Sequence, residues 1–360
     1  MNKVKAKKII NLLIGNFIGV YNKASYLKPD AIITLNNNKD LYIEDNNKEI
    51  QKGIIEVSIF KNVILFPEFS VAAKKDIIEN TFVNETLIDR HFKNKFLKKY
   101  YISKINTEFV TSIDKCFSAS NYFHILIDTL PRLWALRHPF FEDKEITLLL
   151  PHERNNDILT LIRSLIPENV IINKASKYKR YFCKNYIHLP YLSQPRIKTN
   201  NKIPSAGYIP NEYLDFLKNS AISQFNVSET IVPKKNILIS REDAKIRRVI
   251  NEKELLEALK PYHFEKHTLS GKTLKQQIEI FRSAKNIICM HGAALTNLLW
   301  VNPKQCRIIE IFPVNSESKE FYSKHAKTLD LNYNKIEMNS NNINSDIIVG
   351  IESILKLLNQ

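Results

Sequence analysis

Between residues 235 and 312 the chain alternates short apolar runs with amphipathic stretches, and this pattern constrains the fold more than any other feature. The apolar runs predict strands at Lys235–Ile239, Phe264–Leu269, Asn286–Met290 and Arg307–Phe312. Helices are expected around and between them, at Asn211–Ser223, Asn251–Leu259, Thr273–Ser283, Ala293–Leu299 and Ile347–Leu358. Apolar strands that alternate with helices form a parallel sheet with helices on both faces. The second half of the chain is therefore expected to be an α/β domain.

The first half has a more mixed pattern. Short apolar runs between polar turns predict an antiparallel meander over about residues 30–70, with strands at Ala31–Leu35, Leu41–Ile43, Ile54–Ser58 and Val63–Leu65. After it we expect helices at Asn121–Leu136 and Asp157–Leu165 and strands at Ile146–Leu150 and Tyr186–Leu189. Pro195, Pro204 and Pro210 interrupt any pattern between about residues 191 and 210. We place the boundary there, with domains at 1–195 and 196–360.

Glycine and cysteine usage excludes several kinds of site. The chain has 7 glycines, no two spaced G-x-G, whereas the dinucleotide fingerprint and the phosphate-binding P-loop both need closely spaced glycines. The four cysteines stand far apart, at Cys116, Cys183, Cys289 and Cys306. That spacing argues against a zinc site or a disulfide framework, and free thiols suit a reducing compartment.

The charge balance is strongly basic, with a formal net charge of +16. Such a balance suits phosphate-bearing partners or an anionic membrane surface, although the even spread of lysines also fits a merely solvated surface. A nucleic-acid partner is not expected, because the basic residues do not cluster with aromatics.

Near the N-terminus, Lys3–Lys8 precede the apolar stretch Ile9–Tyr21, which is too short and polar to span a bilayer. It predicts either a first helix packed on the core or a basic helix lying on a membrane.

The run from His291 to Asn297 is the strongest local signal for a ligand site. A buried strand ends at Met290, Gly292 permits a tight turn or a close ligand, and Ala293 leaves the N-terminus of the next helix open to an anion. Ligands of open α/β sheets bind at the carboxyl ends of the strands. We therefore expect a phosphate site here; the alternative is that Gly292 only makes a turn and His291 lies on the surface.

A second signal follows the first strand of the same sheet. Four cations lie in one loop, at Arg241, Lys245, Arg247 and Arg248. They could hold a diphosphate through forked, charge-assisted hydrogen bonds, or Glu242 and Asp243 could pair with two of them on the surface. Glu310 is a single acid in an apolar strand, expected either to accept ribose hydroxyls or to pair with a lysine.

In the first half, His124 and Asp128 lie four residues apart on an expected helix, so the carboxylate can orient or charge the imidazole. Such a pair suits a general base or a clamp for a sugar, and the alternative is a structural histidine. Asn121 and Arg132 flank the pair as candidate acceptor contacts.

His263 and His267 fall on an expected strand without a third ligand, so no zinc site is expected. The chain contains no D-x-D, which favours a metal-free phosphate site.

Four segments carry a family resemblance: NYFHILIDTLPRL, ILISREDAKIRRVINEKELLEAL, LKQQIEIFRSAKNIICMHGAALTNLLW and RIIEIFP. Together they resemble glycosyltransferase family 61 over roughly residues 115–335, and the HGAALTN run is the most specific part. The resemblance implies a GT-B fold with two Rossmann-like domains, an acceptor-side domain first and a nucleotide-sugar domain second. The last helix is then expected to return toward the first domain.

The resemblance also implies a function. It is that of an inverting, metal-independent hexosyl- or pentosyltransferase that needs no cofactor and serves capsule or surface polysaccharide synthesis. Its partners would be a nucleotide sugar and a glycan or lipid-linked acceptor. We expect a cytoplasmic enzyme, with possible peripheral contact at the inner face of the plasma membrane. A non-catalytic polysaccharide- or nucleotide-binding module is the alternative.

Each candidate residue takes a role in that function. The donor would be bound by Arg241, Arg247, His291, Gly292, Ala293, Asn297 and Glu310, with Glu310 on the ribose. His124 or Asp128 would deprotonate the acceptor hydroxyl. Asn121 and Arg132 would contact the acceptor.

Overall fold

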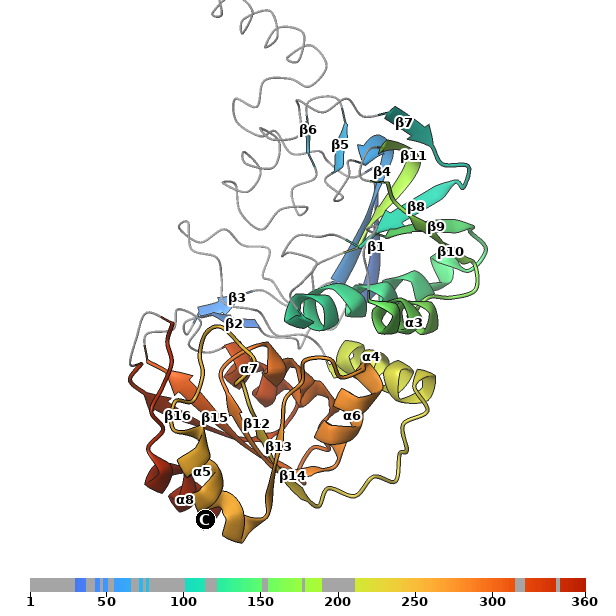
Figure 1. Cartoon of the computed structure of the whole chain (residues 1–360). Coiled ribbons are helices and arrows are strands. Elements are labelled where there is room, and N and C mark those ends of the chain that lie inside the picture. Colours follow the sequence, from blue (N-terminus) through green and yellow to red (C-terminus); the bar gives the residue numbers. More distant parts are fainter. Residues whose placement is uncertain are drawn as a thin grey trace, which may run out of the picture. The chain divides into compact units, whose positions relative to one another are not determined.

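The computed structural model describes residues 30–36, 43–45, 48–50, 55–65, 71–73, 76–77, 101–113, 122–150, 155–176, 179–189, 211–314, 321–340 and 344–360 (Figure 1). The chain divides into two compact units, one of residues 1–155 and 165–204, the other of residues 156–164 and 205–360. The expected N-terminal helix, Cys116, Asn121 and the three boundary prolines lie outside the described residues. No helix in the described part of the chain has the length and apolar character needed to cross a bilayer.

The first unit is built on a mixed sheet. Among the described residues its strands run in the order β10-β9-β8-β11-β4-β5-β6, with β1 beside β4 and β7 beside β11. The strands are β1 (Ala31–Asn36), β4 (Ile55–Leu65), β5 (Val71–Ala73), β6 (Asp76–Ile77), β7 (Tyr101–Lys104), β8 (Phe109–Ser112), β9 (Ile146–Leu150), β10 (Val170–Lys174) and β11 (Lys179–His188). Strands β7 to β11 are parallel, whereas β1, β4, β5 and β6 pair antiparallel. A separate hairpin joins β2 (Ile43–Asp45) and β3 (Lys48–Ile50).

The expected antiparallel meander is only partly correct. The runs Ile54–Ser58 and Val63–Leu65 belong to one strand, β4, because β11 pairs with it on both sides of Asn62, which takes a left-handed φ of 54°. Asparagine tolerates this conformation better than most residues. Strand β4 also pairs with β11, so the meander is the antiparallel margin of a larger sheet. Strands β5 to β8 and β10 were not anticipated.

The helix expected at Asn121–Leu136 is also different in form. The described chain has a π-helix, η2 (His124–Thr129), followed by the 3₁₀ segments η3 (Leu130–Arg137) and η4 (Pro139–Phe141). Pro131 has no amide hydrogen to donate to residue 127, so a regular α-helical ladder cannot continue through it. The Leu130 amide donates to the carbonyl of Ile125, five residues back, which is the π-helical pattern.

The second unit contains a sheet whose strands are all parallel, in the order β13-β12-β14-β15-β16, which confirms the expected α/β pattern. The strands are β12 (Lys235–Ile239), β13 (Phe264–His267), β14 (Ala284–Met290), β15 (Arg307–Pro313) and β16 (Asn332–Met338). The helices are α4 (Asn211–Gln224), α5 (Glu252–Leu259), η5 (Lys260–Tyr262), α6 (Leu274–Arg282), η6 (Ala293–Trp300), α7 (Phe321–Thr328) and α8 (Ile351–Leu358). Helix α3 (Asn156–Leu165) also falls mostly in this unit. Strand β16 and helix α7 were not predicted.

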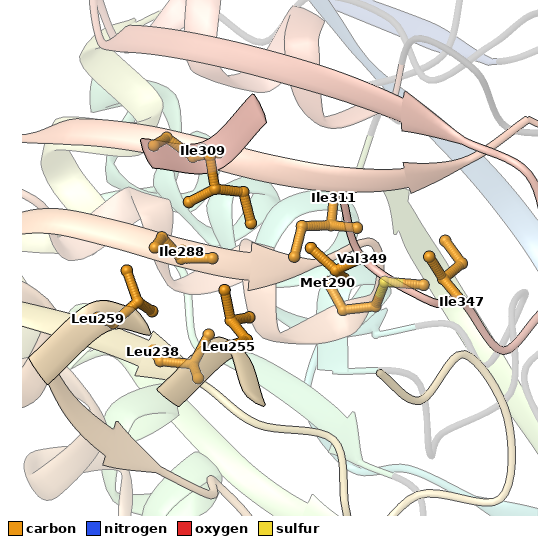
Figure 2. Close-up of a cluster of buried hydrophobic side chains, with 10 residues drawn as sticks. Leu238, Leu255, Leu259, Ile288, Met290, Ile309, Ile311, Ile347 and Val349 are labelled. Carbon is orange, nitrogen blue, oxygen red and sulfur yellow. The ribbon is translucent and has the colours of Figure 1, made fainter. Parts of the chain in front are cut away.

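One apolar cluster holds α5, α8 and the segment at Ile347–Val349 against the sheet (Figure 2). Its buried residues are Leu238, Leu255, Leu259, Ile288, Met290, Ile309, Ile311, Ile347, Val349 and Ile354. Burying one such aliphatic side chain contributes about 1.5–3 kcal/mol. The last helix was expected to return toward the first domain; instead, the apolar face of α8 is buried in the core of the second unit.

The strand order fixes where a ligand site can form. From β12 the chain moves to β13 on one side, and then crosses to β14 on the other side of β12. The connections leave the carboxyl ends of β12 and β14 in opposite directions, and such switch points are where open α/β sheets bind ligands.

Candidate functional site

Arg241 and Gly292 meet at the switch point of the second unit. Arg241 follows β12 and Gly292 follows β14, and the two strands are neighbours with Ile239 opposite Cys289. A Cβ atom placed on Gly292 would lie 2.5 Å from Nη1 and 3.1 Å from Cζ of Arg241. The guanidinium therefore lies directly against the backbone of the turn, an approach that the missing Cβ allows.

Arg247 lies near the same point. Its backbone has a left-handed φ of 58°, and its amide donates to the carbonyl of Asn344 at 2.9 Å. The pKa of Arg247 is lowered, first by burial of the guanidinium and then by the positive charge of Arg241. The two half-buried cations thus repel each other through space.

Neither arginine has a carboxylate partner among the described residues. The Nη2 of Arg241 donates to the carbonyl of Ile246 at 3.4 Å, and its buried Nε has no hydrogen-bond partner in the described chain. Two adjacent cations without acids are costly to desolvate unless an anion completes the site. The geometry is therefore that of an anion site.

The acids of this region bind elsewhere. Glu242 accepts from Lys266 at 2.7 Å, and Glu252 accepts from Lys266 at 2.7 Å and from the Ser240 hydroxyl at 2.8 Å. Asp346 forms an ion pair with Arg248, with 2.9 Å between Nη2 of the arginine and Oδ2 of the carboxylate. Glu242 therefore does not pair with the arginines of its loop, and Arg248 is already engaged.

His291 is buried rather than on the surface, with 3 % of its area exposed. Its Nδ1–H donates to Glu310 Oε1 at 2.5 Å, and the Tyr333 hydroxyl donates to the other carboxylate oxygen. The imidazole also packs edge-on against Phe312 and Tyr322. This chain of contacts fixes the turn that precedes Gly292.

The ribose contact expected of Glu310 does not fit this arrangement. Both of its oxygens are engaged and 1 % of the residue is exposed. Glu310 also pairs with a histidine rather than with a lysine.

Asn297 is likewise structural in its described contacts. The fully buried amide donates to Gln277 Oε1 and to the carbonyl of Ala294, both at 3.1 Å, and accepts from Trp300 Nε1 at 3.0 Å. It ties η6 to α6, and the donor contact expected of Asn297 stays a prediction. Ala293 is exposed at the start of η6, where the expected open helix terminus lies.

The first unit has its own switch point. Strand β8 lies between β9 and β11, and the chain continues from β8 toward η2. There, His124 Nδ1 contacts Asp128 Oδ2, which confirms the expected i,i+4 contact. The His124 side chain is 23 % exposed and that of Asp128 is 3 % exposed. Asp128 Oδ1 is buried without a hydrogen-bond partner among the described residues, and single π-helical turns are frequent at functional sites.

Arg132 does not join this pair in its described contacts. It is buried, and its Nη2 donates to the carbonyl of Leu189, directly after β11. The guanidinium therefore holds η3 on the sheet, and the acceptor contact expected of Arg132 stays a prediction.

The structure adds residues that the sequence did not single out. Ser240, Glu252 and Lys266 surround the turn at Arg241, and Tyr333 completes the bonding of Glu310. Ser240 directly precedes the candidate Arg241, and this was the only sign in the sequence that Ser240 lies near the site. Lys266 and Tyr333 lie on other strands, and no local motif connects them to the site.

The described part of the chain contains no metal-binding cluster, and its cysteines are buried. The described residues include no group of three His, Cys, Asp or Glu side chains placed to hold a metal ion. Cys183, Cys289 and Cys306 are buried free thiols. Burial raises the pKa of each to about 12, so these thiols are unreactive near neutral pH.

Comparison with known proteins gives the family. The family model described as Glycosyltransferase 61 matches residues 122–309, which is 188 of 360 residues. The match contains both pairs described above, His124 with Asp128 and Arg241 with Arg247. No curated protein matches the chain. With more than half of its length matched to the family model, the chain belongs to glycosyltransferase family 61.

Proposed function

We propose that this glycosyltransferase moves a sugar from a nucleotide-sugar donor to a glycan acceptor, with inversion and without a metal ion. The observation that carries the proposal is the pair Arg241 and Arg247, which has no carboxylate partner in the described chain and lies at the switch point beside Gly292. In this role the pair binds the donor diphosphate.

The donor site stabilises the leaving group. When the bond between the anomeric carbon and the phosphate oxygen breaks, the nucleoside diphosphate keeps the electron pair. Two guanidinium groups stabilise the growing charge through forked hydrogen bonds, and the open start of η6 at Ala293 adds its positive helix end. These groups supply the charge that a divalent cation supplies in other phosphoryl sites. His291 and Glu310 act indirectly, by holding the turn.

The acceptor side supplies a base. A single displacement with inversion needs the acceptor hydroxyl to lose its proton as its oxygen bonds to the anomeric carbon. The partly exposed His124 takes that proton, and Asp128 orients the imidazole and stabilises its charged form. The alternative assignment, with Asp128 as the base, uses its unbonded Oδ1.

We further propose a GT-B arrangement, with an acceptor domain at residues 1–195 and a donor domain at 196–360. Each unit has a switch point followed by candidate residues, as this arrangement requires. The acceptor is a capsule or surface glycan, or its lipid-linked precursor. Transfer takes place in the cytoplasm, with Lys3–Lys8 against the inner face of the membrane. Flotation with anionic liposomes, comparing the full chain with one lacking residues 1–21, tests the membrane contact.

A nucleotide-sugar panel tests the donor site. Thermal shift should identify a stabilising donor, because a ligand that binds only the folded state raises its stability. Arg241→Ala and Arg247→Ala should each weaken its binding by about ten- to a hundredfold, the effect of losing charge-assisted hydrogen bonds of about 1.5–3 kcal/mol.

Lys253→Ala is the matched control, since Lys253 is an exposed cation on α5. It should leave binding unchanged. Equal binding by wild type and both arginine variants would contradict the assignment of the donor site.

A further inference from the structure

Two carboxylates lie beside the turn that carries Arg241, and a single lysine binds both. Lys266 lies on β13, opposite Leu238 of β12. Its Nζ contacts Glu242 Oε2 and Glu252 Oε1, each at 2.7 Å. One ammonium therefore holds the acid next to Arg241 in sequence and the first acid of α5.

The same network fixes the backbone on both sides of Arg241. The Ser240 hydroxyl donates to Glu252, with 2.9 Å and 2.8 Å to its two oxygens, and accepts from the Glu242 amide at 3.1 Å. Burial would by itself lower the pKa of Lys266, but the hydrogen bonds and charges of Glu242 and Glu252 outweigh it and raise that pKa. The lysine thus stays charged over the whole range of physiological pH.

Without Lys266 the carboxylates of Glu242 and Glu252 would lose the cation that binds them. Glu242 is largely exposed and adjoins Arg241, so a released carboxylate would compete with an anionic ligand for the guanidinium groups. Opposite charges a few ångströms apart near a protein surface attract substantially, and salt screens that attraction.

We propose that Lys266 is a positioning residue, which keeps Glu242 and Glu252 away from Arg241 and Arg247 and so leaves both guanidinium groups available to a diphosphate. This rests on the proposed donor site. Lys266 lies on a different strand from either arginine and acts on the ligand through Glu242.

Binding of inorganic pyrophosphate, measured by calorimetry in the absence of divalent metal, tests this role. Lys266→Met should weaken binding about fivefold at low salt, the range of a partly exposed charge interaction, and less at high salt. Lys266→Arg should bind like wild type. Lys266→Met combined with Glu242→Gln should recover binding to within about twofold, because the released acid is then neutral.

Three outcomes would count against the proposal. Unchanged binding by Lys266→Met would overturn the role of Lys266. Weak binding that Glu242→Gln does not restore would also overturn it, because the effect of Lys266→Met would then be purely structural. Circular dichroism and the melting temperature of each variant establish that it is folded. Failure of wild type to bind pyrophosphate, with no difference in Arg241→Ala, would instead overturn the donor site, and this proposal with it.

Discussion

Both units have candidate residues at the switch point of a parallel sheet, but the residues of the two candidate sites come together in opposite ways. In each unit the candidate residues follow a parallel strand at a switch point, β8 in the first and β12 and β14 in the second. In the first unit, His124 and Asp128 are four residues apart on one turn. In the second, Arg241 and Gly292 are 51 positions apart and come from two loops.

This difference separates local from long-range determination. The His124–Asp128 contact needs only a helical turn, and it forms even though that turn is π-helical rather than α-helical. The Arg241–Gly292 approach exists only because β12 and β14 are neighbours in register. Activity at the first candidate site should thus be lost only when His124 or Asp128 is replaced. Binding at the second should be weakened both by replacing the arginines and by altering the backbone turn at Gly292.

Loss of the proposed base should have the largest effect. His124→Ala and Asp128→Asn should each lower the rate of sugar transfer by about 10²–10⁴, the usual contribution of general-base catalysis, while nucleotide binding in the second unit is unchanged. A transfer assay with radiolabelled donor, together with calorimetry, measures both. Normal turnover by both variants would remove the catalytic role from the first unit.

Acid should weaken the second unit through His325. Burial lowers the pKa of His325 to about 4, below its usual 6.5. Because the pKa of His325 is lower in the folded state than in the unfolded state, the neutral histidine contributes fully to the free energy of unfolding above pH 6.5. This contribution, about 3 kcal/mol, is lost as the pH falls from 6.5 toward 4. Urea unfolding at a series of pH values checks this. In His325→Gln, which does not titrate, this loss should disappear; an identical loss would assign it to other groups.

Geometry alone should weaken donor binding. In Gly292→Ala the new methyl group displaces the Arg241 guanidinium, so nucleotide binding should fall by about three- to tenfold. Because Gly292 has a φ of 159°, which L side chains rarely adopt, the variant should also lose about 1–3 kcal/mol of stability. Gly271→Ala is the contrast, because Gly271 has a φ of 76° and a Cβ added there would meet no atom within 4 Å. It should cost about 1 kcal/mol of stability and leave binding intact. Equal binding by both variants would mean that the approach to Gly292 has no part in the site.

Chelation should have the smallest effect. If guanidinium groups take the place of a cation, transfer in EDTA should match transfer in buffer. Complete loss of activity in EDTA, restored by Mn²⁺, would mean that the two arginines are not sufficient and that a metal ion completes the donor site.

Much of the fold followed from the sequence because its determinants are local. The alternation of apolar strands and helices predicted the parallel sheet, with β12, β14 and β15 close to their expected bounds. Two predictions failed for different reasons: Pro131 excluded an α-helix, and pairing with β11 on both sides of Asn62 made one strand of two expected ones. Strand β16 was missed because polar residues interrupt Asn332–Met338, which pairs with β15 along its whole length.

The candidate site divides in the same way. The sequence by itself identified Arg241, Arg247, Gly292 and the His124–Asp128 pair, because charge, a missing Cβ and helical spacing are properties of single residues or one turn. Only the tertiary structure decided which of the other candidates are free to bind a ligand. It placed Glu310 against His291 and Tyr333, Asn297 against Gln277, and Arg132 on the carbonyl of Leu189. A polar side chain binds whichever partner the packed strands bring within about 3 Å, and that partner is set by strand order, which no local pattern contains.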